Sequence, residues 1–182
     1  MANVYSTARF TFLLSLAVLA GCASGVKKHD DPEKRAAYFA GGGKLARDVT
    51  LTLSDAARAK LAGNAHFKQD QMLAVIKRKL EAANLLAQTP DPKLPTIEVV
   101  VTDIRVRSTF SAVMFGFMAG SDLVAGDVVA RNHEGKELQR FSVDVSYALG
   151  GAAGGQDATR VGWLYEAFAN ELIKELTGGS GS

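Results

Sequence analysis

The chain is poor in several residue types, and each scarcity narrows what the protein can be. It holds one cysteine in 182 residues, so a disulfide-framed domain is excluded. Its three histidines, His29, His66 and His133, lie in separate segments without a second ligand at helical or strand spacing, so we expect no metal site and no cofactor. The formal net charge is only +2 and no basic face is clustered, which argues against nucleic acid as a partner. No Gly-x-Ser-x-Gly or other catalytic pattern is present, and we expect no enzyme.

Long apolar runs are also scarce. The longest, Phe10 to Ala20, would rise only about 16 Å as a helix. A hydrocarbon core of about 30 Å needs roughly 20 residues. The run therefore fits the apolar region of an export signal, which we place at residues 1–21. The alternative is a buried helix of a cytosolic domain.

The single cysteine follows this run directly. Leu19-Ala20-Gly21-Cys22 resembles the lipobox of bacterial lipoproteins. The resemblance implies that Cys22 is the lipidation site, with diacylglycerol on its sulfur and a fatty acid such as palmitate on its amine after cleavage of the signal. The next residue is Ala23 and not Asp, which resembles the outer-membrane sorting signal. We therefore expect a lipid anchor in the outer membrane, with the domain facing the periplasm. Ordinary secretion with a free thiol is the alternative.

Three further segments follow from composition. Residues 22–47 are mixed in charge and glycine-rich near their end, which favours a flexible tether. Residues 48–177 form one domain, and residues 178–182 are a disordered tail.

The periodicity of the domain predicts an α+β fold with a small, mostly antiparallel sheet of three to four strands and two long helices packed on one face. Strands are expected from residue 49, with a bulge near Thr102 and Asp103, and in a hairpin with its turn at residues 132–135. Ser54 should cap a short helix, and a long amphipathic helix is expected over residues 69–87. The last helix carries an apolar stripe of Val161, Leu164, Tyr165, Phe168, Leu172 and Leu176. Asp122 is interpreted as a turn residue before the hairpin.

Two connections are unusual. The first is dense in apolar side chains: Phe110, Met114, Phe115, Phe117 and Met118. Such a segment either folds over an open end of the core or forms an exposed surface that meets a partner protein or enters the membrane. The second is glycine-rich and ends in a cation: Gly150, Gly151, Gly154, Gly155 and Arg160. It is either a simple crossover or an anion site at a helix start.

From Val49 to Leu176 the chain resembles a family of uncharacterised bacterial lipoproteins that share a domain of unknown function. The residues that carry the likeness are "AGSDLVAGDVVARNHEGKELQRFSV", "ALGGAAGGQDATR" and "WLYEAFANELIKEL". The resemblance implies an envelope lipoprotein and no activity. We expect a non-enzymatic accessory or assembly subunit that binds another envelope protein. The alternative is a module that binds a small ligand or lipid in a cleft near the two unusual connections. The sequence does not define an oligomeric state.

Overall fold

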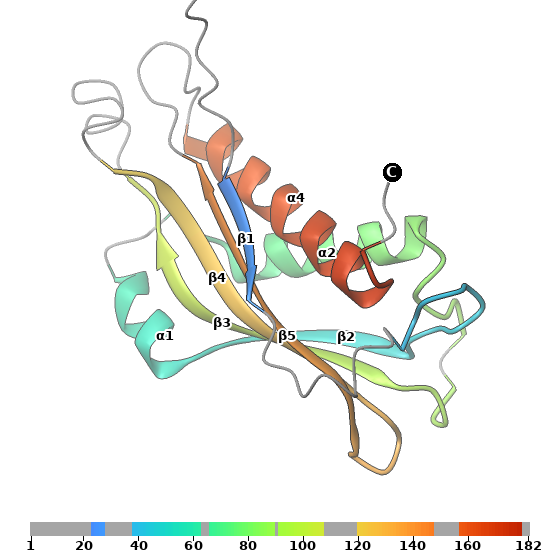
Figure 1. The fold of residues 1–182 in the computed structure, drawn as a ribbon. Helices are drawn as coiled ribbons and strands as arrows, with labels where there is room; N and C mark the ends of the chain where they lie inside the picture. Colours follow the sequence, from blue (N-terminus) through green and yellow to red (C-terminus); the bar gives the residue numbers. More distant parts are fainter. Residues whose placement is uncertain are drawn as a thin grey trace, which may run out of the picture.

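The computed structural model describes residues 23–27, 38–62, 66–89, 91–107, 120–147 and 157–179. A single sheet is covered on one face by helices α2 and α4 (Figure 1). In chain order the elements are β1 (Ala23–Lys27), β2 (Asp48–Leu53), α1 (Asp55–Leu61), α2 (Gln69–Ala82), β3 (Thr96–Arg105), β4 (Asp122–Arg131), β5 (Glu137–Tyr147) and α4 (Asp157–Leu176).

The sheet has five strands in the order β1-β5-β4-β3-β2. The β2–β3 pair is parallel and the other three pairs are antiparallel. The expected α+β class is confirmed, and the sheet is mostly antiparallel as predicted. The parallel pair arises because α1 and α2 carry the chain from the end of β2 back to the start of β3, as a parallel connection requires.

The predicted strand number of three to four is wrong because of β1. Its residues, Ala23 to Lys27, were expected to begin a flexible tether. They pair instead with residues 142–146 of β5. The sequence Ala-Ser-Gly-Val-Lys has no apolar alternation, so no side-chain pattern marks it as a strand. The described domain also includes Phe39 and Ala46, which are buried in the core, so it extends further toward the N-terminus than residue 48.

Local signals place most of the other boundaries. The Ser54 hydroxyl accepts a hydrogen bond from the Ala57 amide at 3.1 Å and caps α1 as predicted. The register of β3 shifts between Val101 and Asp103, which confirms the expected bulge. Gly135 closes the β4–β5 turn with a φ of 80°, a value that favours glycine.

Helix α2 ends five residues earlier than predicted. Asn84 has a φ of 54°, its amide donates to the Glu81 carbonyl, and the Leu85 amide donates to the Leu80 carbonyl, both at 2.9 Å. These two bonds form a Schellman motif, which satisfies the last carbonyls of a helix. Asn tolerates the left-handed region, so Asn84 ends the helix before Pro90 and Pro92 are reached.

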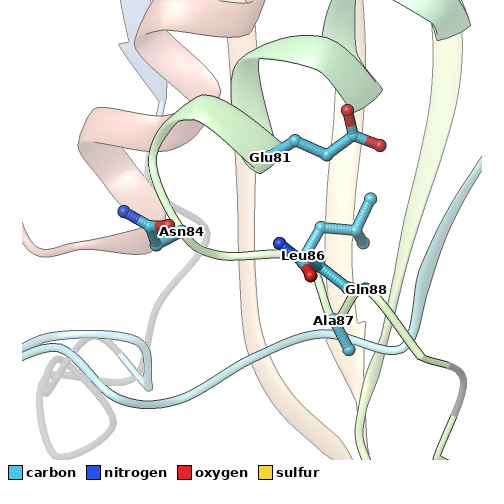
Figure 2. Close-up of a pocket in the computed structure, with 5 residues that line it drawn as sticks. All are labelled: Glu81, Asn84, Leu86, Ala87 and Gln88. Atoms are coloured by element: carbon cyan, nitrogen blue, oxygen red, sulfur yellow. The ribbon is translucent and has the colours of Figure 1, made fainter.

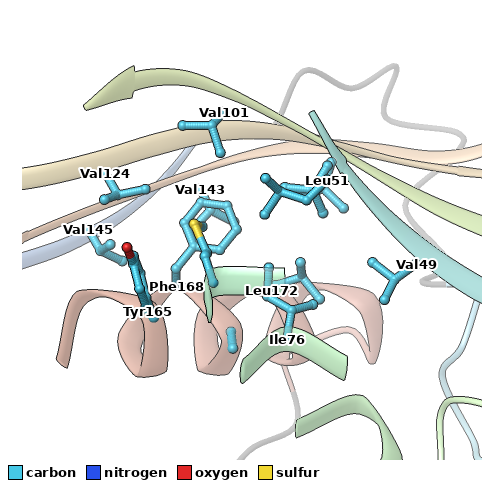
Figure 3. Packing of buried hydrophobic residues seen from close by; sticks show 14 of the residues in the cluster. Val49, Leu51, Ile76, Val101, Val124, Val143, Val145, Tyr165, Phe168 and Leu172 are labelled. Carbon is cyan, nitrogen blue, oxygen red and sulfur yellow. The ribbon is translucent and has the colours of Figure 1, made fainter. Parts of the chain in front are cut away.

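The core lies between the sheet and the two long helices (Figure 3). All six residues of the predicted stripe on α4 are buried, and Met72, Ile76 and Leu80 are buried on α2. Phe168 lies over β4, where a Cβ atom added to Gly126 would lie 3.2 Å from the Phe168 ring and 3.0 Å from the Val100 carbonyl oxygen. Close packing therefore favours glycine at position 126.

The opposite face of the sheet carries polar and charged side chains. Arg131 bonds Glu98 at 3.1 Å and Arg140 bonds Glu137 at 2.7 Å. Ser142 donates to Asp127 across the β4–β5 pair. Such a polar face is typical of an antiparallel sheet with one solvated side.

Candidate functional site

The two unusual connections leave the domain at the same end of the sheet. The Met/Phe segment (residues 110–118) joins the end of β3 to the start of β4, and the glycine-rich segment (residues 150–155) joins the end of β5 to the start of α4. Asp122 at the start of β4 is paired with Tyr147 at the end of β5, and Ala23 at the start of β1 is paired with Ser146. Figure 1 shows the starts of β1, β4 and α4 and the end of β5 together at the upper left. We call this end of the domain the loop end.

Most of the residues proposed as sites lie outside the described residues. These are Cys22, the Met/Phe residues Phe110, Met114, Phe115, Phe117 and Met118, and the glycines Gly150, Gly151, Gly154 and Gly155. Arg160 is described and is fully buried near the start of α4.

A buried cluster of charge lies at the loop end. It consists of Arg107, Asp122 and Arg160, which we call the Arg–Asp–Arg cluster. All three side chains are almost completely buried. The Asp122 carboxylate accepts from the Arg107 backbone amide at 2.7 Å, from Arg107 Nε at 3.2 Å and from Arg160 Nε at 2.9 Å. A buried carboxylate needs such donors, because its desolvation is costly unless it is paired.

The guanidinium groups also hold backbone carbonyls around the loop end. Arg107 Nη1 donates to the Gly120 carbonyl at 2.6 Å, and Arg107 Nη2 donates to the Tyr147 carbonyl at 3.3 Å. Arg160 Nη2 donates to the Arg107 carbonyl at 2.9 Å. Gly120 and Arg107 lie on the two sides of the Met/Phe segment, and Tyr147 and Arg160 lie on the two sides of the glycine-rich segment. The cluster therefore fixes the described ends of both connections to each other.

This arrangement changes the interpretation of Asp122. It was expected in a turn, and the structure places it as the first residue of β4, fully buried. Turn residues are usually exposed, and sequence position alone cannot show that Arg107 and Arg160, 15 and 38 residues away, converge on this carboxylate. Arg160 was proposed as part of an anion site; in the structure its guanidinium contacts the protein's own carboxylate.

Trp163 was not identified from the sequence, although it is the only tryptophan in the chain. It lies on α4, and 45% of its surface is exposed, more than for any other large apolar side chain in the described ranges. Its ring packs edge to face on buried Tyr147, with centroids 5.1 Å apart and an interplanar angle of 71°. The sequence offered one signal of this exposure: Trp163 lies beside the apolar stripe of α4 and not within it.

A small pocket lies away from the loop end, where α2 stops early. It has a volume of about 260 Å³ and is lined by Glu81, Asn84, Leu86, Ala87 and Gln88. Ligand pockets usually measure roughly 300–1,000 Å³ and have converging polar groups. In Figure 2 the Glu81 and Asn84 side chains point in different directions. This pocket is not the cleft expected near the two unusual connections.

Two features are absent from the described residues, a metal-binding cluster and a membrane-spanning helix. In the part of the chain that the structure describes, no group of three or more His, Cys, Asp or Glu side chains could hold a metal ion. His133 is exposed in the β4–β5 turn, His66 is exposed before α2, and His29 lies outside the described ranges. None of the described helices combines the length and apolar character needed to cross a membrane.

Comparison with known proteins gives a family and a distant similarity of fold. A sequence family described as "Domain of unknown function (DUF4410)" matches residues 26–151. No curated protein matches the chain. Two structures of the PelC dodecamer from Paraburkholderia phytofirmans, one of them of a variant, are similar at 12% identity. They cover 86% and 85% of this chain and 99% of PelC, with TM-scores of 0.48 and 0.44. Similarity at this level carries no inference about assembly or activity.

Proposed function

The chain belongs to the family described as a domain of unknown function, DUF4410, and from that premise we propose that it is a lipid-anchored lipoprotein of the bacterial envelope. Its anchor is Cys22, acylated after removal of residues 1–21, and Ala23 in the next position directs it to the outer membrane, facing the periplasm. Its domain acts as a non-enzymatic accessory or assembly subunit that binds another envelope protein.

The observation that carries this proposal is the lipobox-like sequence with the chain's single cysteine. Leu19-Ala20-Gly21-Cys22 follows an apolar run too short to span a bilayer. Three acyl chains would hold the domain stably, since two membrane signals already suffice.

The proposed partner contact is the Met/Phe segment. The support for this contact comes from composition. The segment between β3 and β4 holds more large apolar side chains than a connection between two strands requires. Leaving one such side chain in water forgoes about 1.5–3 kcal/mol of burial. The Arg–Asp–Arg cluster adds support, because it gives the segment a rigid base: Gly120 is bonded directly to Arg107.

Fatty-acid labelling tests the anchor. We expect the wild-type protein to incorporate labelled palmitate and to be processed. We expect Cys22→Ser to incorporate none and to keep its signal, because the thioether cannot form. An unlabelled wild-type protein would contradict the anchor.

Crosslinking and pull-down from envelopes tests the partner contact. Phe115→Ser with Phe117→Ser should leave the free energy of unfolding within about 0.5 kcal/mol, as is typical for surface changes, and should reduce partner recovery. Thr50→Ser with Thr52→Ser, on the exposed side of β2, is the matched control and should retain the partner. A loss of several kcal/mol in the Phe variant would show instead that the segment is part of the core.

A further inference from the structure

Strand β2 lies at one edge of the sheet, with no further strand beside it among the described residues. Residues 49–53 read Val-Thr-Leu-Thr-Leu, without charge, proline or glycine. A segment of this kind at a sheet edge can pair with a strand of a second copy. Many edges are protected by lysine, proline or a bulge. The run has no lysine or proline, and its register with β3 is unbroken, so its protection must come from elsewhere.

The pairing with β3 shows which backbone groups of β2 face outward. The Ser54 amide donates to the Val101 carbonyl at 2.9 Å. In a parallel pair, alternate residues direct their backbone groups to the partner strand. The even-numbered residues of β2 therefore face β3, and the backbone groups of Val49, Leu51 and Leu53 face the open edge.

Two of these outward carbonyls are already bonded to side chains of neighbouring helices. The Leu51 carbonyl accepts from Gln69 Nε2 at 2.9 Å, at the start of α2. The Leu53 carbonyl accepts from Arg58 Nη2 at 3.0 Å, in α1. A further strand could pair here only after these bonds were broken. Gln69 and Arg58 thus occupy the positions of its amides, and we call them the edge side chains.

Neighbouring contacts continue this protection along the strand. Arg58 also donates to Asp55 at 2.9 Å, one turn earlier in α1. At the start of β2 the Val49 amide donates to the Asp48 carboxylate at 2.8 Å, and Lys77 of α2 pairs with that carboxylate at 2.9 Å. Side chains from α1, α2 and β2 itself therefore reach the same edge.

Just before β2 the edge is covered by backbone. The Ala46 amide donates to the Leu85 carbonyl at 2.7 Å, and the Ala87 amide donates to the Ala46 carbonyl at 2.8 Å. The segment that follows α2 thus takes the place of a neighbouring strand at this point. Protection of the edge begins with backbone at residue 46 and continues with side chains to residue 53.

We propose that the edge side chains, Arg58 and Gln69, keep the β2 edge closed to strand addition by a second copy of the chain. Both are exposed, and neither belongs to the apolar core. Removing them should therefore open the edge without emptying the core. The inference is independent of the proposed anchor and partner contact, because it uses none of the residues assigned to them.

Crosslinking between copies tests the proposal. Thr52 is exposed on β2, so Thr52→Cys places a thiol beside the edge. The full-length chain, purified in detergent, is treated with a thiol crosslinker that spans roughly 8 Å, the diagonal spacing of side chains on paired strands. With the edge side chains intact, covalent dimer should not exceed the background from Cys22 in the chain without Thr52→Cys. With Arg58→Ala and Gln69→Ala it should rise about fivefold or more, because the freed carbonyls can accept from a second copy.

Two controls separate the edge from general association. Arg105→Ala with Gln71→Ala removes the same residue types from other exposed positions, and should leave the Thr52→Cys dimer unchanged. Asn170→Cys places the thiol instead on an exposed position of α4, which packs over β4 and β5. Its dimer should not rise when the edge side chains are removed.

The single variants make the test independent of how the double variant folds. Arg58→Ala and Gln69→Ala should each raise the Thr52→Cys dimer about twofold or more, with an unchanged circular dichroism spectrum. No rise in the folded variants overturns the proposal, because other groups would then close the edge. The same dimer level in the intact chain overturns it too, since the edge would be open. Loss of the fold in a single variant, or an equal rise at Asn170→Cys, also overturns it, because the side chains would then support packing or the association would not involve β2.

Discussion

At the scale of single residues, the core is organised around Phe168. Its ring is fully buried on α4 and lies against Gly126, where any side chain would meet the ring and the Val100 carbonyl. The large ring of Phe168 on α4 therefore fits against Gly126 on β4, which has no side chain. The burial of Phe168 was predictable, because the apolar stripe on α4 is periodic. The role of Gly126 was not, because it depends on a partner 42 residues away.

Replacing Phe168 tests this packing. Phe168→Ala should lower the free energy of unfolding by about 3–5 kcal/mol, because the site loses its buried ring and a cavity remains. The measurement is a urea titration followed by circular dichroism. Phe168→Leu, which keeps most of the apolar volume, should cost clearly less. A loss below about 1 kcal/mol for the alanine variant would mean that α4 buries a different face.

At the scale of elements, α2 and α4 are joined by an ion-pair network on their outer surfaces. Glu166 on α4 accepts from Lys79 at 3.0 Å and from Arg78 on α2. The hydrogen bond from Lys79, together with that from Arg78 and the charges of both side chains, lowers the pKa of Glu166 below its ordinary value of 4.5. The carboxylate is therefore favoured by folding.

The lowered pKa gives a pH dependence of stability with a definite sign. The unfolded chain takes up a proton at Glu166 before the folded chain does, so the contribution is fully present above about pH 5 and is lost as the pH falls through the folded pKa. Glu166→Gln should cost under about 1 kcal/mol at pH 7, because the pair is partly exposed and screened by salt. The two unfolding curves should converge once the pH has fallen below the folded-state pKa of Glu166. Glu81→Gln, at an exposed position in α2, is the control. A constant difference across the pH range would contradict an electrostatic origin.

Helix ends show why the elements were only partly predictable. Helix α4 ends at Leu176, next to the domain boundary expected at residue 177. Gly178 has a φ of 86°, and the Gly179 amide donates a hydrogen bond to the Lys174 carbonyl. The end of α2 uses the same motif with Asn84 in place of glycine, and the apolar periodicity beyond it hid the boundary. Leu85 and Leu86 continue to pack, but as an extended segment that pairs with Ala46.

At the scale of the whole molecule, the Arg–Asp–Arg cluster bonds together the described ends of the Met/Phe segment and of the glycine-rich segment. It could not be predicted, because its members come from the end of β3, the start of β4 and the first turn of α4. Arg107, Asp122 and Arg160 are each of a charged residue type that usually lies on a protein surface. By contrast β2, β3, β4, β5 and the helices follow from local periodicity, which is independent of distant partners.

Removing the shared carboxylate tests the cluster. Asp122→Asn should cost about 3–5 kcal/mol, the usual loss when one partner of a buried pair is removed, because the two guanidinium groups lose the charge they share. The unfolding titration should be compared with Arg105→Met. Arg105 lies at the same end but is exposed, and bonds only Ser121 among the described residues. If Asp122→Asn costs no more than this control, another group must balance the two arginines.

The pairing of β1 with β5 also affects the order in which the fold is completed. β1 is the first described segment to leave the ribosome, yet its partner residues, 142–146, are more than a hundred positions later in the chain. Contacts of such high sequence separation form late, because closing the loop costs entropy before the contact is gained. Until then the edge of β5 presents unpaired backbone groups that can recruit another strand. In native-state hydrogen exchange the β1 amides should therefore open at lower free energy than those of β3 and β4, and a nascent chain should need protection along β5 until its own first strand arrives.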